Sequence, residues 1–163
     1  MAVFLIIRLR GEADIHPDVE YTLNLLRLRQ KFAASIYPDD LPGIREMLRK
    51  VEYWTTYGKL DVKHREVLVE LIRRRGRLLG DKPITDEWVA SKLGLYGGIN
   101  ELAEKLLKGE LRYHELEKYG VKPFFRLHPP RGGFKKTIKR HYRDGGELGD
   151  RGEAIGELVL KML

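Results

Sequence analysis

The part of the sequence with the clearest chemical character is residues 126–143, which contain seven lysine or arginine residues and no aspartate or glutamate. The rest of the chain carries as many acidic as basic residues, so this stretch equals the whole formal net charge of +7. Clustered cations without acids favour a polyanionic partner, because each cation can neutralise a phosphate. The seven are Arg126, Arg131, Lys135, Lys136, Lys139, Arg140 and Arg143.

Side chains with flat rings are interleaved with these cations: His128, Phe134, His141 and Tyr142. Such rings can stack on unpaired bases. Five glycines between residues 132 and 149 would let the backbone approach a phosphate closely. We therefore predict a long basic loop over residues 130–150 that becomes ordered on RNA. The alternative is a solvated loop without a partner, and the complete absence of acids favours RNA contact.

Two further groups of cations are candidates for the same chemistry. Arg73, Arg74, Arg75 and Arg77 lie at the end of a predicted helix. Helix-dipole stabilisation on a solvated surface explains that group as well as RNA contact does. The other group could converge at one edge of a sheet, where phosphate contact is favoured over a charged rim. It consists of Arg8, Arg10, Arg27, Arg29 and Lys31.

Most other chemistry is excluded by what the sequence lacks. It has no cysteine, and its five histidines are not spaced as metal ligands, so we expect no disulfide, metal or cofactor. No phosphate-binding loop, nucleophile elbow or zinc-protease motif occurs, so we expect no enzyme. The acidic pairs at residues 39–40 and 86–87 fit helix capping better than acid–base catalysis. Asparagine and glutamine are scarce, a pattern typical of hyperthermophiles.

No segment suggests a membrane protein. The apolar run at residues 2–7 is short and is followed directly by arginines, and nothing approaches the roughly 18 apolar residues of a membrane span. We therefore expect a cytoplasmic protein.

Periodicity predicts the elements that must position these cations. Residues 3–10 alternate as a strand, a helix begins at Pro17, and residues 32–37 form a second strand. A second helix, capped by Asp40, follows with apolar residues at i, i+3, i+4 and i+7. The first 60 residues thus favour two-layer packing of helices on a sheet.

The middle of the chain, residues 61–120, is predicted to be a helical insertion whose segments end at glycines. Asp61 and Thr85 would cap two of its helices. Residues 124–129 resemble a last strand, and residues 153–163 a C-terminal helix. We expect one compact domain, in which residues 1–60 and 121–163 form the RNA-binding core and residues 61–120 the insertion.

The segment Phe124–Phe134, read as Phe-Phe-Arg-Leu-His-Pro-Pro-Arg-Gly-Gly-Phe, closely resembles a hallmark of the ribosomal protein L-thirty family, called L-seven in eukaryotes. Residues 22–31 are similar to the first-helix motif of that family, and residues 44–58 to its second-helix region. The resemblance runs over almost the whole chain. Absence of a long basic N-terminal extension resembles the archaeal type.

This resemblance implies an α+β fold with a ferredoxin-like β-α-β-α-β core, a three-stranded sheet with two helices. The third strand would be Phe124–His128, and the insertion, the basic loop and the C-terminal helix would be additions. Arg45 joins the implied RNA-binding residues, although Glu46 beside it stands where the family often has glycine.

The function that the resemblance implies is that of a structural constituent of the 50S ribosomal subunit. The protein would bind 23S rRNA near 5S rRNA, beside other large-subunit proteins, and would not be a homo-oligomer. A non-ribosomal RNA- or DNA-binding regulator would show the same charge pattern. An RNA-modification factor would need a catalytic constellation that the sequence does not show.

Overall fold

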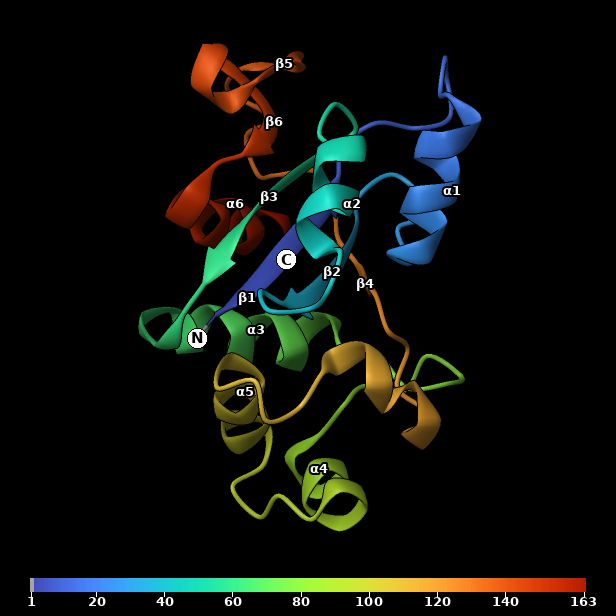
Figure 1. Cartoon of the computed structure of the whole chain (residues 1–163). Coiled ribbons are helices and arrows are strands. Elements are labelled where there is room, and N and C mark those ends of the chain that lie inside the picture. The colour runs from blue at the N-terminus through green and yellow to red at the C-terminus, as the bar shows by residue number, and fades with distance from the viewer. Residues whose placement is uncertain (1) are drawn as a thin grey trace.

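The computed structural model describes residues 2–163, which form an α+β fold that begins β-α-β-α-β, as expected (Figure 1). In chain order the strands and α-helices are β1 (Val3–Arg8), α1 (Pro17–Leu25), β2 (Ala33–Pro38), α2 (Ile44–Lys50), β3 (Thr55–Leu60), α3 (Arg65–Arg75), α4 (Asp86–Leu93), α5 (Ile99–Leu107), β4 (Phe125–Arg126), β5 (Thr137–His141), β6 (Gly146–Asp150) and α6 (Ile155–Met162). Short 3-10 helices lie at η1 (Val62–His64), η2 (Tyr113–Tyr119), η3 (Tyr142–Asp144) and η4 (Gly152–Ala154).

The strands form one mixed sheet in the order β4-β2-β1-β3-β6-β5. β1 is central and pairs antiparallel with both neighbours, so that Val3 lies opposite Pro38 on β2 and opposite Leu60 on β3. β4 pairs antiparallel with β2 at one edge, and β6 pairs parallel with β3 on the other side.

The expected position of the third strand is wrong. That strand is β3, and of the segment Phe124–His128 only β4 forms a strand, at the edge of a sheet that has six strands in residues 2–163 rather than three. The sequence pattern does not indicate β3, because Thr55 and Thr56 are polar residues. Both are nevertheless buried. Their hydroxyls donate to main-chain oxygens, Thr55 to Val51 at 3.0 Å and Thr56 to Gly149 at 3.1 Å.

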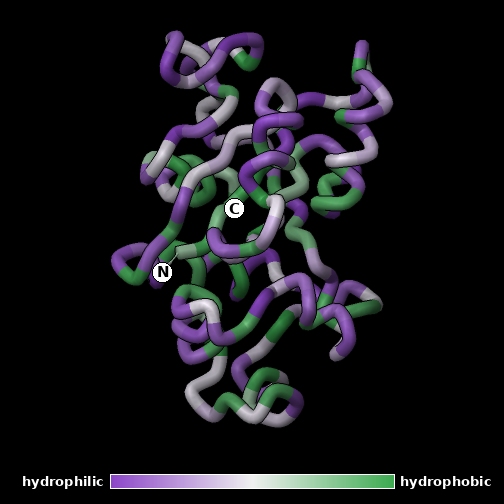
Figure 2. The backbone as a smooth tube through the Cα atoms, viewed as in Figure 1, coloured by the Kyte–Doolittle hydropathy of each residue, from purple (hydrophilic) through white to green (hydrophobic). Residues whose placement is uncertain are grey.

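Within the first 60 residues α1 and α2 pack on one face of the sheet, which is the expected two-layer packing, and later helices cover the other face. Val3, Leu5 and Ile7 of β1 point into one core, which they share with apolar residues of α3, α5 and α6. Phe4 and Ile6 point into a second core, which they share with α1 and α2. Figure 2 shows hydrophobic segments on both sides of β1, including α6 on one side and the end of α1 on the other. Such double coverage explains why every residue of β1 is buried.

Residues 61–120, the predicted insertion, contain η1, α3, α4, α5 and η2 and no named strand. Thr85 caps α4 by accepting a hydrogen bond from the Trp88 amide at 3.1 Å, and Asp61 caps η1, which leads into α3. α3 ends at Gly76, and η2 ends at Gly120. The expected Asp40 cap is wrong, because the residue that precedes α2 is a left-handed glycine whose turn needs no side-chain cap.

Residues 131–150 are not one long loop, which corrects a further expectation. They contain β5 and β6, joined by η3 and paired in parallel with an irregularity between Thr137 and His141. The two segments approach so closely that a Cβ at Gly146 would collide with the main-chain carbonyl of Arg140. We call residues 135–150 the arm. It stands at one end of the molecule, beyond the start of β3 (Figure 1).

Candidate nucleic-acid interface

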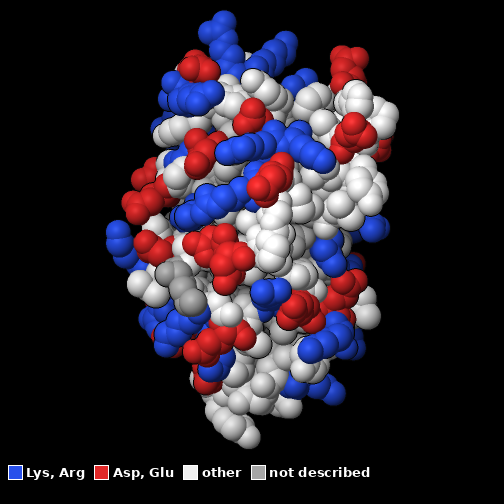
Figure 3. All heavy atoms as spheres, viewed as in Figure 1, with Lys and Arg blue, Asp and Glu red and all other residues white. Residues whose placement is uncertain are grey.

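The arm presents its predicted cations to solvent. Figure 3 shows lysine and arginine side chains projecting from the end of the molecule that carries β5. Arg143 lies 4.0 Å from Asp144, an acid that follows the predicted stretch directly. The arm can therefore meet a polyanion with most of its charge exposed. Its exposed cations are Lys135, Lys136, Lys139, Arg140 and Arg143.

A buried ion pair attaches the arm to the sheet. Arg151 and Glu147 lie 2.6 Å apart with only 6% and 8% of their side chains exposed. Arg151 also donates to the Thr56 hydroxyl on β3 at 2.7 Å and to the Glu147 main-chain oxygen at 2.7 Å. The second Glu147 oxygen accepts from the Lys136 amide at 3.1 Å. These bonds fix the arm to β3, so its cations are positioned before any partner binds.

Three predicted contact residues are engaged inside the protein instead. His141 is 9% exposed, and its ring packs against Tyr53 with centroids 4.5 Å apart. Phe134 is half-buried and stacks on Phe32 at 6.3 Å. The Tyr142 ring is half-buried between the Lys136 ammonium, at 5.1 Å, and the Arg151 guanidinium, at 5.0 Å. These rings contact other parts of the protein in this structure, and Phe134 and Tyr142 stay partly exposed, so their stacking on bases stays a prediction.

Arg8 is a positioning residue rather than a surface cation. It is 1% exposed, and burial lowers the pKa of its guanidinium. Its Nη1 donates to the Leu28 main-chain oxygen and its Nε to that of Arg10, both at 2.8 Å. Leu28 is itself buried between the exposed Arg29 and the half-buried Arg27. Arg8 thus holds the loop that carries two predicted contact residues, and its buried side chain cannot itself contact a partner.

The other cations of the N-terminal part lie apart from one another. Arg10 covers the Trp54 ring at 4.3 Å and donates to the Tyr53 main-chain oxygen at 3.2 Å. Lys31 is exposed and lies 5.1 Å from the Phe32 ring. Arg45 is exposed on α2, 5.4 Å from the Phe4 ring. The structure does not gather these three into one site.

Residues that follow β4 run along the C-terminal helix. The His128 amide donates to the Met162 main-chain oxygen at 2.9 Å, and the Arg131 amide to that of Lys161 at 3.0 Å. Both side chains are exposed, so His128 and Arg131 remain available to a partner on this side of the molecule.

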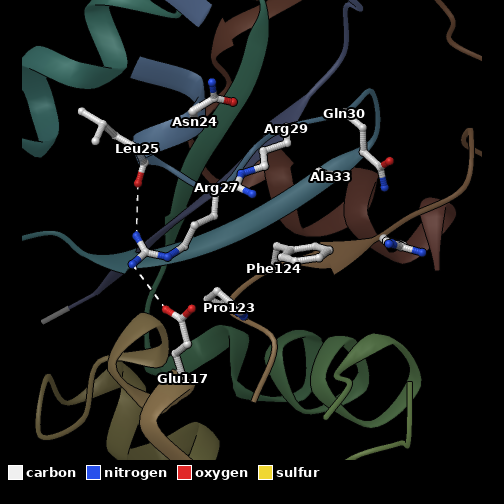
Figure 4. Close-up of a pocket in the computed structure, with 10 residues that line it drawn as sticks. Asn24, Leu25, Arg27, Arg29, Gln30, Ala33, Glu117, Pro123 and Phe124 are labelled. Carbon is white, nitrogen blue, oxygen red and sulfur yellow. Dashed lines mark hydrogen bonds and ion pairs between the residues drawn. The ribbon is translucent and has the colours of Figure 1, made fainter. Parts of the chain in front are cut away.

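A groove of about 520 Å³ opens between the loop after α1, the edge strand β4 and the insertion (Figure 4). Arg27 reaches across it to Glu117 on η2, 3.6 Å away. Arg29 lies on the same loop, and Arg126 comes from β4. The remaining lining residues are Asn24, Leu25, Gln30, Ala33, Pro123 and Phe124.

A smaller groove of about 200 Å³ adjoins the first, because Phe124 and Arg126 line both. Arg75 and Arg77 from the end of α3, together with Lys122, also line this second groove. Burial, and then the neighbouring arginines, lower the pKa of Arg75. Its Nε is buried and has no hydrogen-bond partner within residues 2–163.

The two grooves join two cation groups that the sequence left separate. Arg75 and Arg77 lie near Arg126, whereas Arg73 pairs with Asp86 at 3.2 Å and Arg74 lies exposed elsewhere on α3. Sequence reasoning missed the lining residues Asn24, Gln30, Lys122 and Phe124. The scarcity of carboxamide side chains could have drawn attention to the first two, since the chain has only three.

Other kinds of site find no support in residues 2–163. No group of three His, Cys, Asp or Glu side chains there could hold a metal ion. No helix in that range is both long enough and apolar enough to cross a membrane.

Comparison with known proteins identifies the family of the chain. The model of the family described as ribosomal protein L30p/L7e matches residues 4–55, from β1 to the start of β3. The chain is 64% identical to large ribosomal subunit protein uL30 of Aeropyrum pernix over 163 residues, which is 100% of both chains. It is 58% identical to uL30 of Hyperthermus butylicus, covering 99% of this chain and 90% of that one. It is 54% identical to uL30 of Staphylothermus marinus, covering 99% and 98%. The chain therefore belongs to the ribosomal protein L30p/L7e family.

Proposed function

We propose that this protein is a structural, non-enzymatic component of the large ribosomal subunit. It binds 23S rRNA close to 5S rRNA and lies beside other large-subunit proteins. Full-length similarity to proteins named large ribosomal subunit protein uL30 supports the assignment to this particle. The resemblance of Phe124–Phe134 to the family hallmark supports the choice of rRNA.

The observation that carries the proposal is the arm, where five exposed cations stand on a base fixed by the Arg151–Glu147 pair. Binding proceeds by neutralisation of rRNA phosphates and release of their counterions. Because the arm is held in place beforehand, little conformational entropy is lost when it docks. Binding should consequently weaken steeply as salt concentration rises.

The test replaces four arm cations by glutamine, as Lys135→Gln, Lys136→Gln, Lys139→Gln and Arg140→Gln together. The matched control removes the same charge from exposed lysines elsewhere, as Lys63→Gln, Lys82→Gln, Lys92→Gln and Lys108→Gln. Affinity for 23S rRNA fragments is measured across a range of salt concentrations. A plot of log K against log salt has a negative slope. We expect the arm variant to make this slope less steep by about 3–4, and the control to leave it nearly unchanged.

Assembly supplies the second measurement. Wild-type protein should co-sediment with large subunits at moderate salt, and the arm variant should be depleted from them. Equal incorporation of the arm variant and the control would show that the arm does not carry the function. RNA binding without co-sedimentation would favour a non-ribosomal regulator instead.

A further inference from the structure

The groove beside β4 has a composition that the arm lacks. Its floor is apolar and includes an aromatic ring, Phe124, next to Pro123 and Ala33. Figure 4 shows Pro123 and Phe124 on the segment that leads into β4, with Arg27, Arg29 and Gln30 opposite them on the loop after α1. A flat apolar surface rimmed by cations suits a group that is both aromatic and anionic.

Carboxamides are concentrated in this groove. The chain contains two asparagines and one glutamine, and two of these three residues, Asn24 and Gln30, line it. A carboxamide both donates and accepts hydrogen bonds, which is what the edge of a nucleobase requires. Arginine and lysine, which dominate the arm, only donate.

The cations lie on two sides of the ring. Arg27 and Arg29 line the larger groove, Arg75 and Arg77 line the smaller one, and Phe124 and Arg126 line both. Six lysine or arginine side chains line the two grooves, against the two carboxylates Glu117 and Asp81. A nucleic-acid strand that crosses Phe124 would therefore meet cations before and after the ring.

The size of the larger groove limits what it can hold. A volume of about 520 Å³ lies within the roughly 300–1,000 Å³ of small-ligand sites, so one nucleotide fits and a double helix does not. The loop that forms one wall is held in an unusual backbone conformation. Arg27 and Phe32 both have positive φ, 63° and 68°, and the buried Arg8 bonds to the Leu28 oxygen between them. Such conformations persist where the surroundings enforce them, so this wall is formed before a ligand arrives.

We propose that this groove binds one unpaired nucleotide of the bound RNA, with its base stacked on Phe124 and its edge at Asn24 and Gln30. Arg29 and Arg126 hold the phosphate on one side of the base, and Arg75 and Arg77 hold the phosphate on the other. Glu117 restrains Arg27 and keeps the mouth of the groove less cationic than its far end. The subsite rests on the proposed RNA-binding function and adds to it a base-recognising contact away from the arm.

The test uses Phe124→Leu, which keeps apolar bulk and removes the aromatic face. Phe124→Tyr keeps the ring, and Tyr96→Leu removes an exposed aromatic ring elsewhere in the chain as the matched control. Thermal denaturation checks that each variant is folded. The probes are a single-stranded oligoribonucleotide with one central 2-aminopurine and the duplex of the same sequence.

We expect Phe124→Leu to weaken single-strand binding about 5- to 150-fold, the range for loss of one stacked base, and to abolish the 2-aminopurine quenching. Phe124→Tyr should retain the quenching because the aromatic face remains. Tyr96→Leu should bind and quench like the wild type, and binding of the duplex should be insensitive to all three changes. The double variant Asn24→Ala/Gln30→Ala should reduce the preference among the four bases at the probed position. Ultraviolet crosslinking should place the nucleotide on the peptide that contains Phe124.

Unchanged single-strand affinity and unchanged quenching in Phe124→Leu would overturn the subsite. If the four-glutamine arm variant loses binding in the same assay, the RNA-binding function stands and only the subsite fails. If the wild-type chain binds neither probe nor 23S rRNA fragments, both proposals fall.

Discussion

Replacing Arg151 by methionine keeps an unbranched apolar side chain, removes the guanidinium and leaves the Glu147 carboxylate buried without its cation. The pair is 2.6 Å apart and almost fully excluded from water, so little solvent can compensate. Removing one partner of such a pair costs about 3–5 kcal/mol. A domain of this size is typically stable by about 5–15 kcal/mol, so we expect the midpoint of urea unfolding to fall substantially.

Removal of both charges should be tolerated better than removal of one. The double variant Arg151→Met/Glu147→Leu leaves neither ion uncompensated, so it should recover much of the stability that each single variant loses. Urea unfolding followed by circular dichroism measures the three free energies. Hydrogen exchange should additionally show faster exchange of arm amides in Arg151→Met, while β1 stays protected. Single variants within about 1 kcal/mol of the wild type, or losses that simply add in the double variant, would refute this account of the arm.

Three further outcomes are expected. Gly58→Ala drives a methyl group into neighbouring backbone and should cost about 1–3 kcal/mol in urea unfolding or prevent folding, whereas Gly11→Ala meets open space and should be nearly neutral. Thr85→Ala removes the cap of α4 and should cost about 1 kcal/mol, while Ser91→Ala in the same helix should not destabilise. Burial, foremost, lowers the pKa of His114 below 6.5, so the unfolded chain binds a proton more readily. Stability should therefore fall as pH drops below about 6.5, and less so in His114→Phe, when unfolding is measured at pH values of about 7.5 and 5.5.

The sequence predicted those helices and strands whose buried residues recur at regular helix or strand spacing. β1, α1, α5 and α6 carry apolar residues at strand or helix spacing, and Thr85 and Gly76 mark helix ends in the sequence. The family resemblance supplied a β-α-β-α-β core but placed its third strand at Phe124–His128 instead of at β3. Neither the local patterns nor the resemblance indicated which strands pair with each other.

What could not be predicted depends on contacts between distant parts of the chain. Thr56 reads as polar, yet it is buried because its hydroxyl reaches Gly149, 93 positions away. Arg8 belongs to a run of basic residues at the end of a strand, which suggests an exposed side chain. It is buried instead, and it donates a hydrogen bond to the Leu28 main-chain oxygen. The grooves at Phe124 form where the loop near residue 27, the end of α3 and β4 lie side by side. No residue spacing in the sequence predicts that these three segments are neighbours.

Parallel pairing of β3 with β6, at Thr56 with Gly149 and Tyr57 with Asp150, sets the order in which a newly made chain can mature. Synthesis delivers β1, β2 and β3 first, and β3 then exposes an open edge that could pair wrongly with another strand. Residues 146–151 both close that edge and bring in Arg151, which fastens the arm. A chain interrupted earlier is consequently prone to aggregate and presents its cations on an unsecured segment.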